Sequence, residues 1–230
     1  VDSKGLYTKR SYQYDTYPGS MLYKKQLPVR EQISCGTSPD ACNMLVEGNR
    51  YVYVNMPGIR HGVNNPRLTE HYKTNLSDPI ECEDFMFDDY LELETTYRNS
   101  SGRVLGYTGK DGVPHAYIYG AEGYYLLAQI DNVHYDDAVA LHPDLSAVTR
   151  DVHKLSANAE NTLRSITGAF VTTYQYEPFA GVSNIKYPSG LEYYYQYDNK
   201  NRLEQTGISG TYGFPGHPIQ RYEYQIATEN

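Results

Sequence analysis

Tryptophan is absent from this sequence of 230 residues, and continuous apolar runs are short. A segment such as 124–128 falls far below the roughly 20 apolar residues that a membrane-spanning helix needs. Basic charge is also scarce, because 28 acidic residues against 20 basic ones give a net charge of −8. Since no Lys/Arg cluster and no basic helix occur, we expect neither nucleic-acid binding nor attraction to an anionic membrane.

Cysteine occurs only three times. Cys35 and Cys42 flank the turn-rich hexapeptide Gly-Thr-Ser-Pro-Asp-Ala, whose ends can approach to disulfide distance, which leaves Cys82 alone. Export of the protein would favour a bridge between Cys35 and Cys42, and the alternative is three buried free thiols. No Cys-x-x-Cys pair or Cys/His spacing of a zinc site is present, so we expect no metal and no other cofactor.

Motifs of catalytic sites are missing too. The sequence lacks a Gly-x-Ser-x-Gly elbow, a glycine-rich phosphate loop and a His-Glu-x-x-His pair. Acidic residues crowd into 81–94, but without calcium-binding spacing, and a solvated strand face or edge is the simpler interpretation. A glycosidase-like pair of acids meeting across strands stays open as an alternative. We expect a protein that is not an enzyme.

Tyrosine is abundant, with 26 copies beside 19 glycines and 12 prolines. Tyrosine favours a half-buried pleated surface, so this composition indicates strands joined by turns. An internal repeat organises part of it: YQYEPFAGV (174–182) aligns with YQYDNKNRL (195–203) at an offset of 21 residues. The matching positions are Tyr174 with Tyr195, Tyr176 with Tyr197, Glu177 with Asp198, Gly181 with Arg202, and Val182 with Leu203.

The repeat predicts a β-hairpin. A period of two places Tyr193, Tyr195 and Tyr197 on one face of a strand and Tyr194 on the other. The acid that follows is a favoured first residue of a type I turn, after which the chain returns over 202–206. Looser copies of the first half occur at 12–15, 85–88 and 222–224, and the second half recurs at 102–105. Hairpins laid side by side form an antiparallel sheet.

Two further signals complete the plan. The Asp-Gly pair within 110–113 predicts a turn between strands at 104–108 and 115–119, with Pro114 at the edge or start of the returning strand. The period becomes helical over 134–168, where we expect helices at 136–141, from 143 (with Leu145, Val148, Val152 and Leu155 on one side), and at 159–166. We therefore expect irregular hairpins in 1–133, a helical insert in 134–168 and regular hairpins in 169–230, all in one continuous domain.

The tyrosine-rich stretch has two interpretations. Rings at Tyr193, Tyr194, Tyr195 and Tyr197 can stack on sugar rings while their hydroxyls bond sugar oxygens, which would make a carbohydrate-binding face. Sheet packing explains the same residues through cross-strand aromatic pairs. The regular offset favours packing, because a binding site has no need of such periodicity.

The pattern Tyr-x-Tyr-Asp-x-x-x-Arg-Leu at 195–203, together with the stretches 99–114 and 171–176, resembles the YD-repeat, or Rhs-repeat, proteins. The likeness covers about 101–224, fits 1–98 loosely, and is strongest to long surface or secreted proteins of Bacteroides-like bacteria. It implies a spiralling shell of successive β-hairpins that often encloses a toxin, together with export, a scaffold role and contact with glycans or a cell-surface protein.

This chain is too short to close such a shell, and it lacks the Asp-Pro-x-Gly pairs of self-cleaving members. We therefore expect part of a shell, in a piece of a longer extracellular or cell-surface protein whose main partner is the rest of its own chain.

Overall fold

The computed structural model describes residues 6–17, 25–57, 64–81, 86–100, 103–120, 123–141, 145, 152–209 and 216–224. The chain divides into two compact units, Val1–Val113 and Pro114–Asn230. Strands dominate the described residues of both units, and they are joined mainly as successive antiparallel hairpins, with two short α-helices in the second unit. The predicted class, a mainly β chain of hairpins with a small helical insert, is confirmed.

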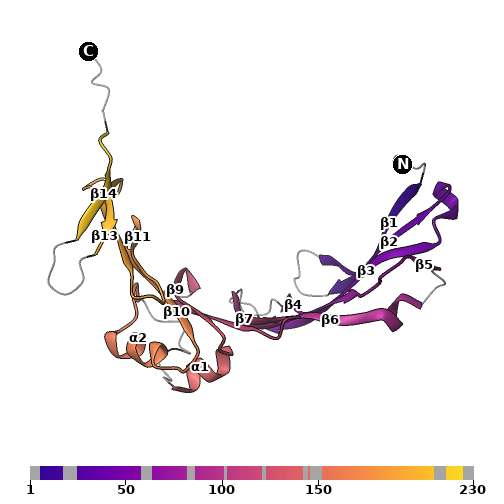
Figure 1. Ribbon diagram of the computed structural model, residues 1–230, viewed down its shortest axis with the longest axis horizontal. Coiled ribbons are helices and arrows are strands. Elements are labelled where there is room, and N and C mark those ends of the chain that lie inside the picture. Colours follow the sequence, from indigo (N-terminus) through magenta and orange to yellow (C-terminus); the bar gives the residue numbers. More distant parts are fainter. Residues whose placement is uncertain are drawn as a thin grey trace, which may run out of the picture. The chain divides into compact units, whose positions relative to one another are not determined.

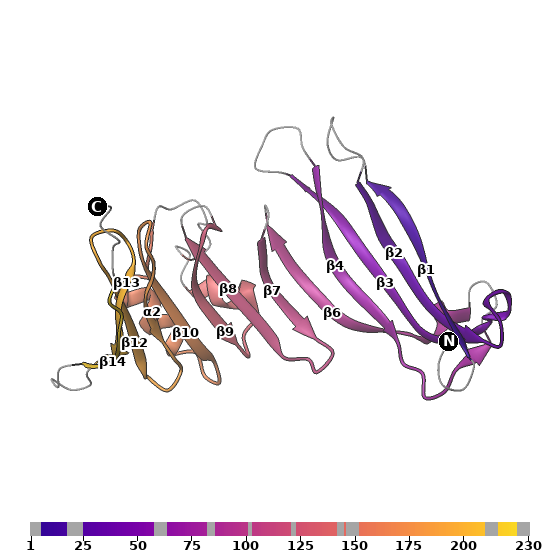
Figure 2. The same ribbon diagram turned by 90° about the horizontal axis from the view of Figure 1, so that it is seen from above.

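The first unit is one antiparallel sheet of long strands. Its strands are β1 (Tyr7–Tyr17), β2 (Lys25–Gly36), β3 (Met44–Pro57), β4 (Asn64–Thr74), β5 (Ile80–Glu81), β6 (Leu91–Ser100) and β7 (Arg103–Gly109). They lie side by side in the order β1-β2-β3-β4-β6-β7 (Figure 2), and the short β5 pairs with β3.

Burial in this unit is uneven, and much of it is polar. Leu45 is fully buried, whereas buried Thr74 and Asn99 bond to the backbone: Thr74 Oγ1 accepts from Gly48 N at 2.8 Å, and Asn99 Nδ2 donates to Leu68 O at 2.6 Å. Such bonds offset the cost of removing these polar groups from water.

The predicted disulfide is not formed. Both Cys35 and Cys42 are free thiols, and Cys82 lies outside the described residues. Ser38 caps the 3-10 helix η1 (Pro39–Ala41), with its side chain accepting from Ala41 N at 3.2 Å. The turn brings Cys42 Sγ 3.3 Å from Ser38 O, so this thiol donates to a carbonyl instead of meeting the other cysteine.

The acid-rich segment 81–94 differs from expectation in part, because only its end, with exposed Glu92 on β6, forms a solvated strand face. Residues 86–90 form the 3-10 helix η2 (Met86–Tyr90), so the looser repeat copy at 85–88 is not a strand, and Phe85 itself lies outside the described residues. The strand β6 that follows has a neighbour on each side and is not an edge. Asp88 pairs with Arg30, and Glu92 accepts from Lys110 at 2.9 Å, so acids of this segment form ion pairs with residues distant in the sequence.

The predicted turn at 110–113 is confirmed. Gly112 has φ of 73°, which suits glycine, and its N–H donates to Gly109 O at 2.9 Å. Asp111 Oδ1 accepts from Val113 N at 3.1 Å, as a turn aspartate does. The next strand begins at Pro114, one of the two positions predicted for that proline.

The second unit is a shorter-stranded meander with the helices between its second and third strands. Its elements are β8 (Pro114–Gly120), β9 (Tyr125–Asp131), α1 (Tyr135–Leu141), α2 (Ala157–Arg164), β10 (Phe170–Glu177), β11 (Gly181–Lys186), β12 (Glu192–Tyr197), β13 (Leu203–Ile208) and β14 (His217–Arg221). Each strand pairs antiparallel with the next. The repeat segments 174–182 and 195–203 thus form adjacent hairpins of one sheet, as predicted.

Both helices lie together on one side of this sheet (Figure 1). They cover its most buried side chains. These lie opposite one another on adjacent strands, as Ala116, Ile130 and Val171 do on β8, β9 and β10. From the helices, Ala138 and Leu163 are fully buried. The insert therefore supplies the second layer that the apolar face of the sheet requires.

Helix boundaries were predicted in part. The first helix ends at Leu141, before His142-Pro143, and α2 lies two residues earlier than expected because Ser156 caps it, accepting from Ala159 N at 3.2 Å. The helix expected from 143 is not supported where it can be seen: residues 152–156 are not helical, and most of the rest lies outside the described residues. Within the described part of the chain, no helix is long and apolar enough to cross a membrane.

Candidate functional site

The predicted binding tyrosines lie on β12 and are half-buried. Tyr193 pairs with Ile185, which pairs with Tyr174, so these side chains share one face of the sheet. The ring of Tyr187 meets Tyr193 edge-on, with centroids 5.9 Å apart. We call Tyr174, Tyr187, Tyr193 and Tyr195 the tyrosine cluster.

Hydroxyl partners divide the four predicted tyrosines into two pairs. Tyr197 donates to Val182 O at 2.8 Å, and Tyr194 accepts from Gln205 Nε2 at 2.7 Å. Tyr193 and Tyr195 form no hydroxyl bond to any described residue. Burial raises the pKa of the Tyr195 hydroxyl. Two of the four therefore have a structural role, and two have hydroxyls open to a ligand; binding itself stays a prediction.

Tyrosine hydroxyls connect successive hairpins. Tyr197 bonds the carbonyl of Val182, and Tyr224 bonds that of Leu203 at 2.8 Å. Val182 and Leu203 are equivalent positions of the repeat, so the same bond recurs one hairpin later. Tyr176 does the same toward the hairpin before it, donating to Leu126 O at 3.0 Å.

The strand irregularities show that β8–β9 is a third copy of the repeat. In β10–β11 the register shifts so that Tyr176 faces Val182, and in β12–β13 so that Tyr197 faces Leu203. In β8–β9 the same shift makes Tyr119 face Leu126. This copy was not predicted from the sequence. Its signal was the Tyr-Ile-Tyr at 117–119, which is not followed by the acid of the repeat.

Asp198 and Arg202 form a staple within the β12–β13 turn. The two Asp198 oxygens accept from Lys200 N (2.8 Å), Arg202 N (3.0 Å) and Arg202 Nε (2.8 Å). These bonds, led by the Arg202 backbone N–H, lower the pKa of Asp198 from 3.8 to about 2. The sequence predicted the acid as the first turn residue but not its bond to the arginine side chain.

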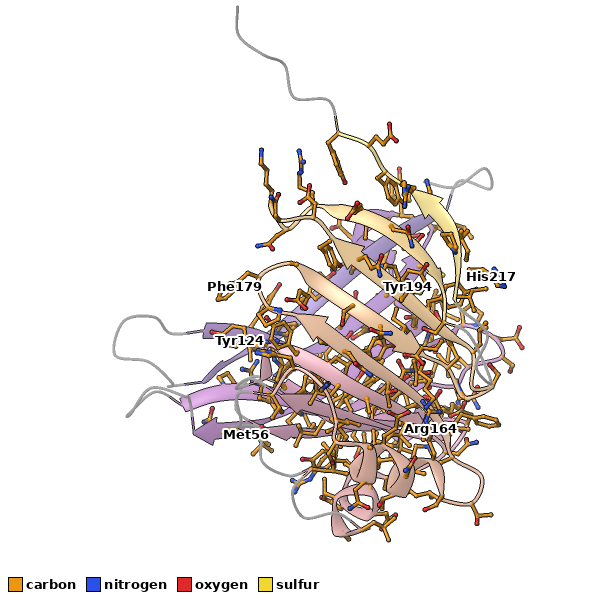
Figure 3. All side chains as sticks on the ribbon, turned by 90° about the vertical axis from the view of Figure 1, so that its left-hand side faces the viewer. Met56, Tyr124, Arg164, Phe179, Tyr194 and His217 are labelled. Atoms are coloured by element: carbon orange, nitrogen blue, oxygen red, sulfur yellow. The ribbon has the colours of Figure 1, made fainter. Side chains whose placement is uncertain are left out.

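The β10–β11 turn is built differently. Its Phe179 has φ of 64° and is 95% exposed, pointing away from the sheet (Figure 3). Gly181 has φ of 153°, and a Cβ on it would lie 2.6 Å from the Tyr197 hydroxyl. The repeat therefore has glycine here because a tyrosine of the next hairpin occupies that space.

Arg164 fastens the insert to this first regular hairpin (Figure 3). Its guanidinium donates to five oxygens, at 2.8–3.2 Å; they are Glu160 Oε1, Val171 O, Thr173 Oγ1, Lys186 O and Tyr187 O. Lys186 Nζ also lies 2.9 Å from Glu160 Oε1. The Glu-x-x-x-Arg spacing within α2 was the only local signal of this anchor.

A groove of about 560 Å³ lies where the segment between α1 and α2 meets β10 and β11. Its lining comprises Val152, His153, Lys154, Leu155, Ser156, Gln175, Tyr176, Glu177 and Ser183. Tyr176 N donates to His153 O at 2.9 Å, and the His153 ring packs edge-on against Tyr125 with centroids 5.2 Å apart. In the described part of the chain, no three metal-binding side chains converge.

No protein-family model matches the chain, and no curated protein matches it in sequence. Among solved structures it is similar to a chain in the crystal structure of TcdB2-TccC3-Cdc42, at 12% identity and a TM-score of 0.49, over 98% of this chain and 10% of that chain. It is also similar to a chain in the Photorhabdus luminescens Tc holotoxin pore with a TccC3 mutation, at 12% identity and a TM-score of 0.46, over 98% and 10%. The chain spans about a tenth of the length of each of these two chains.

Proposed function

We propose that this chain is a non-enzymatic structural module of a larger exported YD-repeat protein, at the cell surface or secreted. It supplies a series of hydrogen-bonded β-hairpins that serves as a scaffold for surface interaction or for enclosing a toxin segment. Its main partner is the rest of its own longer chain.

The hydroxyl bonds between hairpins are the observation that supports this proposal. Tyr197 and Tyr224 each bond the carbonyl of the equivalent residue one hairpin earlier, Val182 and Leu203. Groups engaged in this way hold neighbouring hairpins together and are not available to a substrate. A module whose recurring residues bind one another is suited to extension into a longer sheet.

A deletion tests the modular role. Removing the 21 residues 177–197 joins Tyr176 to Asp198, which recreates one complete repeat and removes one hairpin. We expect a folded chain with the circular dichroism of an antiparallel sheet and a cooperative thermal transition. The matched control removes 177–196, which shifts the register by one residue and turns the side chains to the opposite faces.

The control should unfold or aggregate. Equal loss of structure in both deletions would contradict the modular role. For the exported location, antibodies against this chain should label intact cells or the culture medium of the organism that encodes it, and labelling only after lysis would contradict it.

The tyrosine cluster favours carbohydrate contact as a second candidate function. Tyr193 and Tyr195 present rings and unbonded hydroxyls on the face opposite to Tyr194, a chemistry that suits sugars. A glycan array and calorimetry test it. We expect Tyr195→Phe to weaken binding and Tyr194→Ala to act through stability, since Tyr194 bonds Gln205. No binding at millimolar sugar would contradict this function.

A further inference from the structure

The groove beside β10 carries polar side chains that the fold leaves unused. Lys154, Gln175, Glu177 and Ser183 line it, and none of these side chains forms a hydrogen bond or ion pair with another described residue. In the next hairpin, by contrast, Asp198 binds Arg202 and Gln205 binds Tyr194. Donors and acceptors that converge on a concavity without partners are what a ligand site requires.

The backbone edge beside the groove is already occupied. Tyr176 N donates to His153 O, so the segment between α1 and α2 takes the place that an added peptide strand would take. Val152 O lies 2.5 Å from where a Cβ of Gly120 would be, which shows how closely this segment is seated on β8. A ligand in the groove must therefore be held by side chains and not by strand addition.

The charges of the lining point to a neutral ligand. Lys154 and Glu177 are one cation and one carboxylate, and the other unused groups, Gln175 and Ser183, are an amide and a hydroxyl. A phosphate or other anion would meet the Glu177 carboxylate, and the net charge of −8 gives it no attraction. Amide, carboxylate and hydroxyl together suit a ligand rich in hydroxyl groups.

Comparison with the next hairpin explains why the carboxylate is unused. At the offset of 21, Glu177 corresponds to Asp198, whose partner Arg202 is replaced by Gly181 in the first hairpin. Loss of that arginine leaves Glu177 without its staple, on the hairpin that the groove adjoins.

We propose that this groove binds a neutral saccharide through Gln175, Glu177 and Ser183. Gln175 alternates with Tyr174 and Tyr176 along β10, so it points to the side of the sheet away from Tyr174 and the tyrosine cluster. The site is thus separate from the carbohydrate contact considered above, and it is independent of the scaffold role.

Nuclear magnetic resonance of the isotope-labelled 230-residue chain tests the proposal. The probes are glucose, galactose, mannose, N-acetylglucosamine, maltose, cellobiose and chitobiose, each titrated to about 20 mM, which spans the weak binding expected of a single small site. We expect saturable shifts of the His153, Gln175 and Ser183 amides with at least one probe. Glu177→Gln and Gln175→Ala should each weaken binding about tenfold.

Repeat-equivalent positions provide the matched controls. Gln196→Ala repeats the change of Gln175→Ala at the equivalent position on β12. Glu204→Gln repeats the change of Glu177→Gln on β13, at the position equivalent to Ser183. Both control variants should leave binding unchanged. Shifts confined to Tyr193 and Tyr195 would assign the sugar to the tyrosine cluster and overturn the proposal. It would also be overturned by no shift with any probe, or by equal weakening in the control variants.

Discussion

The hairpins β10–β11 and β12–β13 have the same tyrosine pattern but are braced by different means. In β12–β13 the brace lies inside the turn, where Asp198 binds Arg202. In β10–β11, Glu177 and Gly181 cannot form that staple, and Arg164 of α2 binds the far end of the hairpin instead. The repeat thus fixes how the strands pair, whereas the turn varies once another element holds the hairpin.

The largest effect is expected from removing the external brace. Arg164→Ala removes one donor from each of five acceptors, and the Arg164 side chain is only 19% exposed, so the change should lower the opening free energy of β10–β11 by about 3 kcal/mol. Amide hydrogen exchange resolves this by segment. Arg202→Ala is the matched change and should act mainly on β12–β13; the same protection loss in both variants would remove the distinction between the two braces.

The next effect concerns the glycine of the first turn. Gly181→Ala puts a Cβ 2.6 Å from the Tyr197 hydroxyl and adds strain at φ of 153°, which should cost about 2 kcal/mol in the free energy of unfolding. In a Tyr197→Phe background the hydroxyl is gone, so the penalty of the glycine substitution should shrink. Denaturant unfolding of the four variants measures this coupling. Strictly additive penalties would mean that the tyrosine does not select the glycine.

A smaller loss is expected from one hydroxyl. Tyr197→Phe removes the bond to Val182 O and should destabilise the chain by about 1 kcal/mol. Tyr195→Phe, the matched change, removes a hydroxyl that bonds no described residue and should be nearly neutral. Thermal unfolding of the two variants compares them, and equal shifts of Tm would show that the bond between hairpins does not contribute.

The smallest effect is expected only in acid. Asp198 has a folded pKa of about 2 against an ordinary value of 3.8, so its carboxylate stabilises the turn fully above about pH 4, and the contribution is lost as the pH falls toward 2. Exchange protection of the Lys200 and Arg202 amides should fall over this range. Asp198→Asn should remove that pH dependence; its persistence in the variant would assign it to another group.

Local pattern predicted the parts of the fold that local contacts decide. The offset of 21 located both regular hairpins, and Pro143 placed the end of the first helix at Leu141. The Asp-Gly turn was found because glycine chemistry specifies its geometry. Each of these features depends on residues that are close together in the sequence.

Contacts between distant residues decided the rest. Asp88 pairs with Arg30, 58 residues away, where the sequence indicated only a strand. Arg164 reaches carbonyls of β11 through a face of α2 that no local pattern identifies. The groove also depends on the docking of His153 beside Tyr176. The long insertion between β9 and β10 separates the repeats in the sequence, so no local pattern indicates this contact.

The register shifts of the three hairpins have a consequence for curvature. Each returning strand, β9, β11 and β13, holds one extra residue at the same place relative to its tyrosine. A bulge increases the right-handed twist of a strand pair, so every added hairpin contributes the same increment of rotation. A longer array of this repeat would therefore twist by an amount that its own backbone sets.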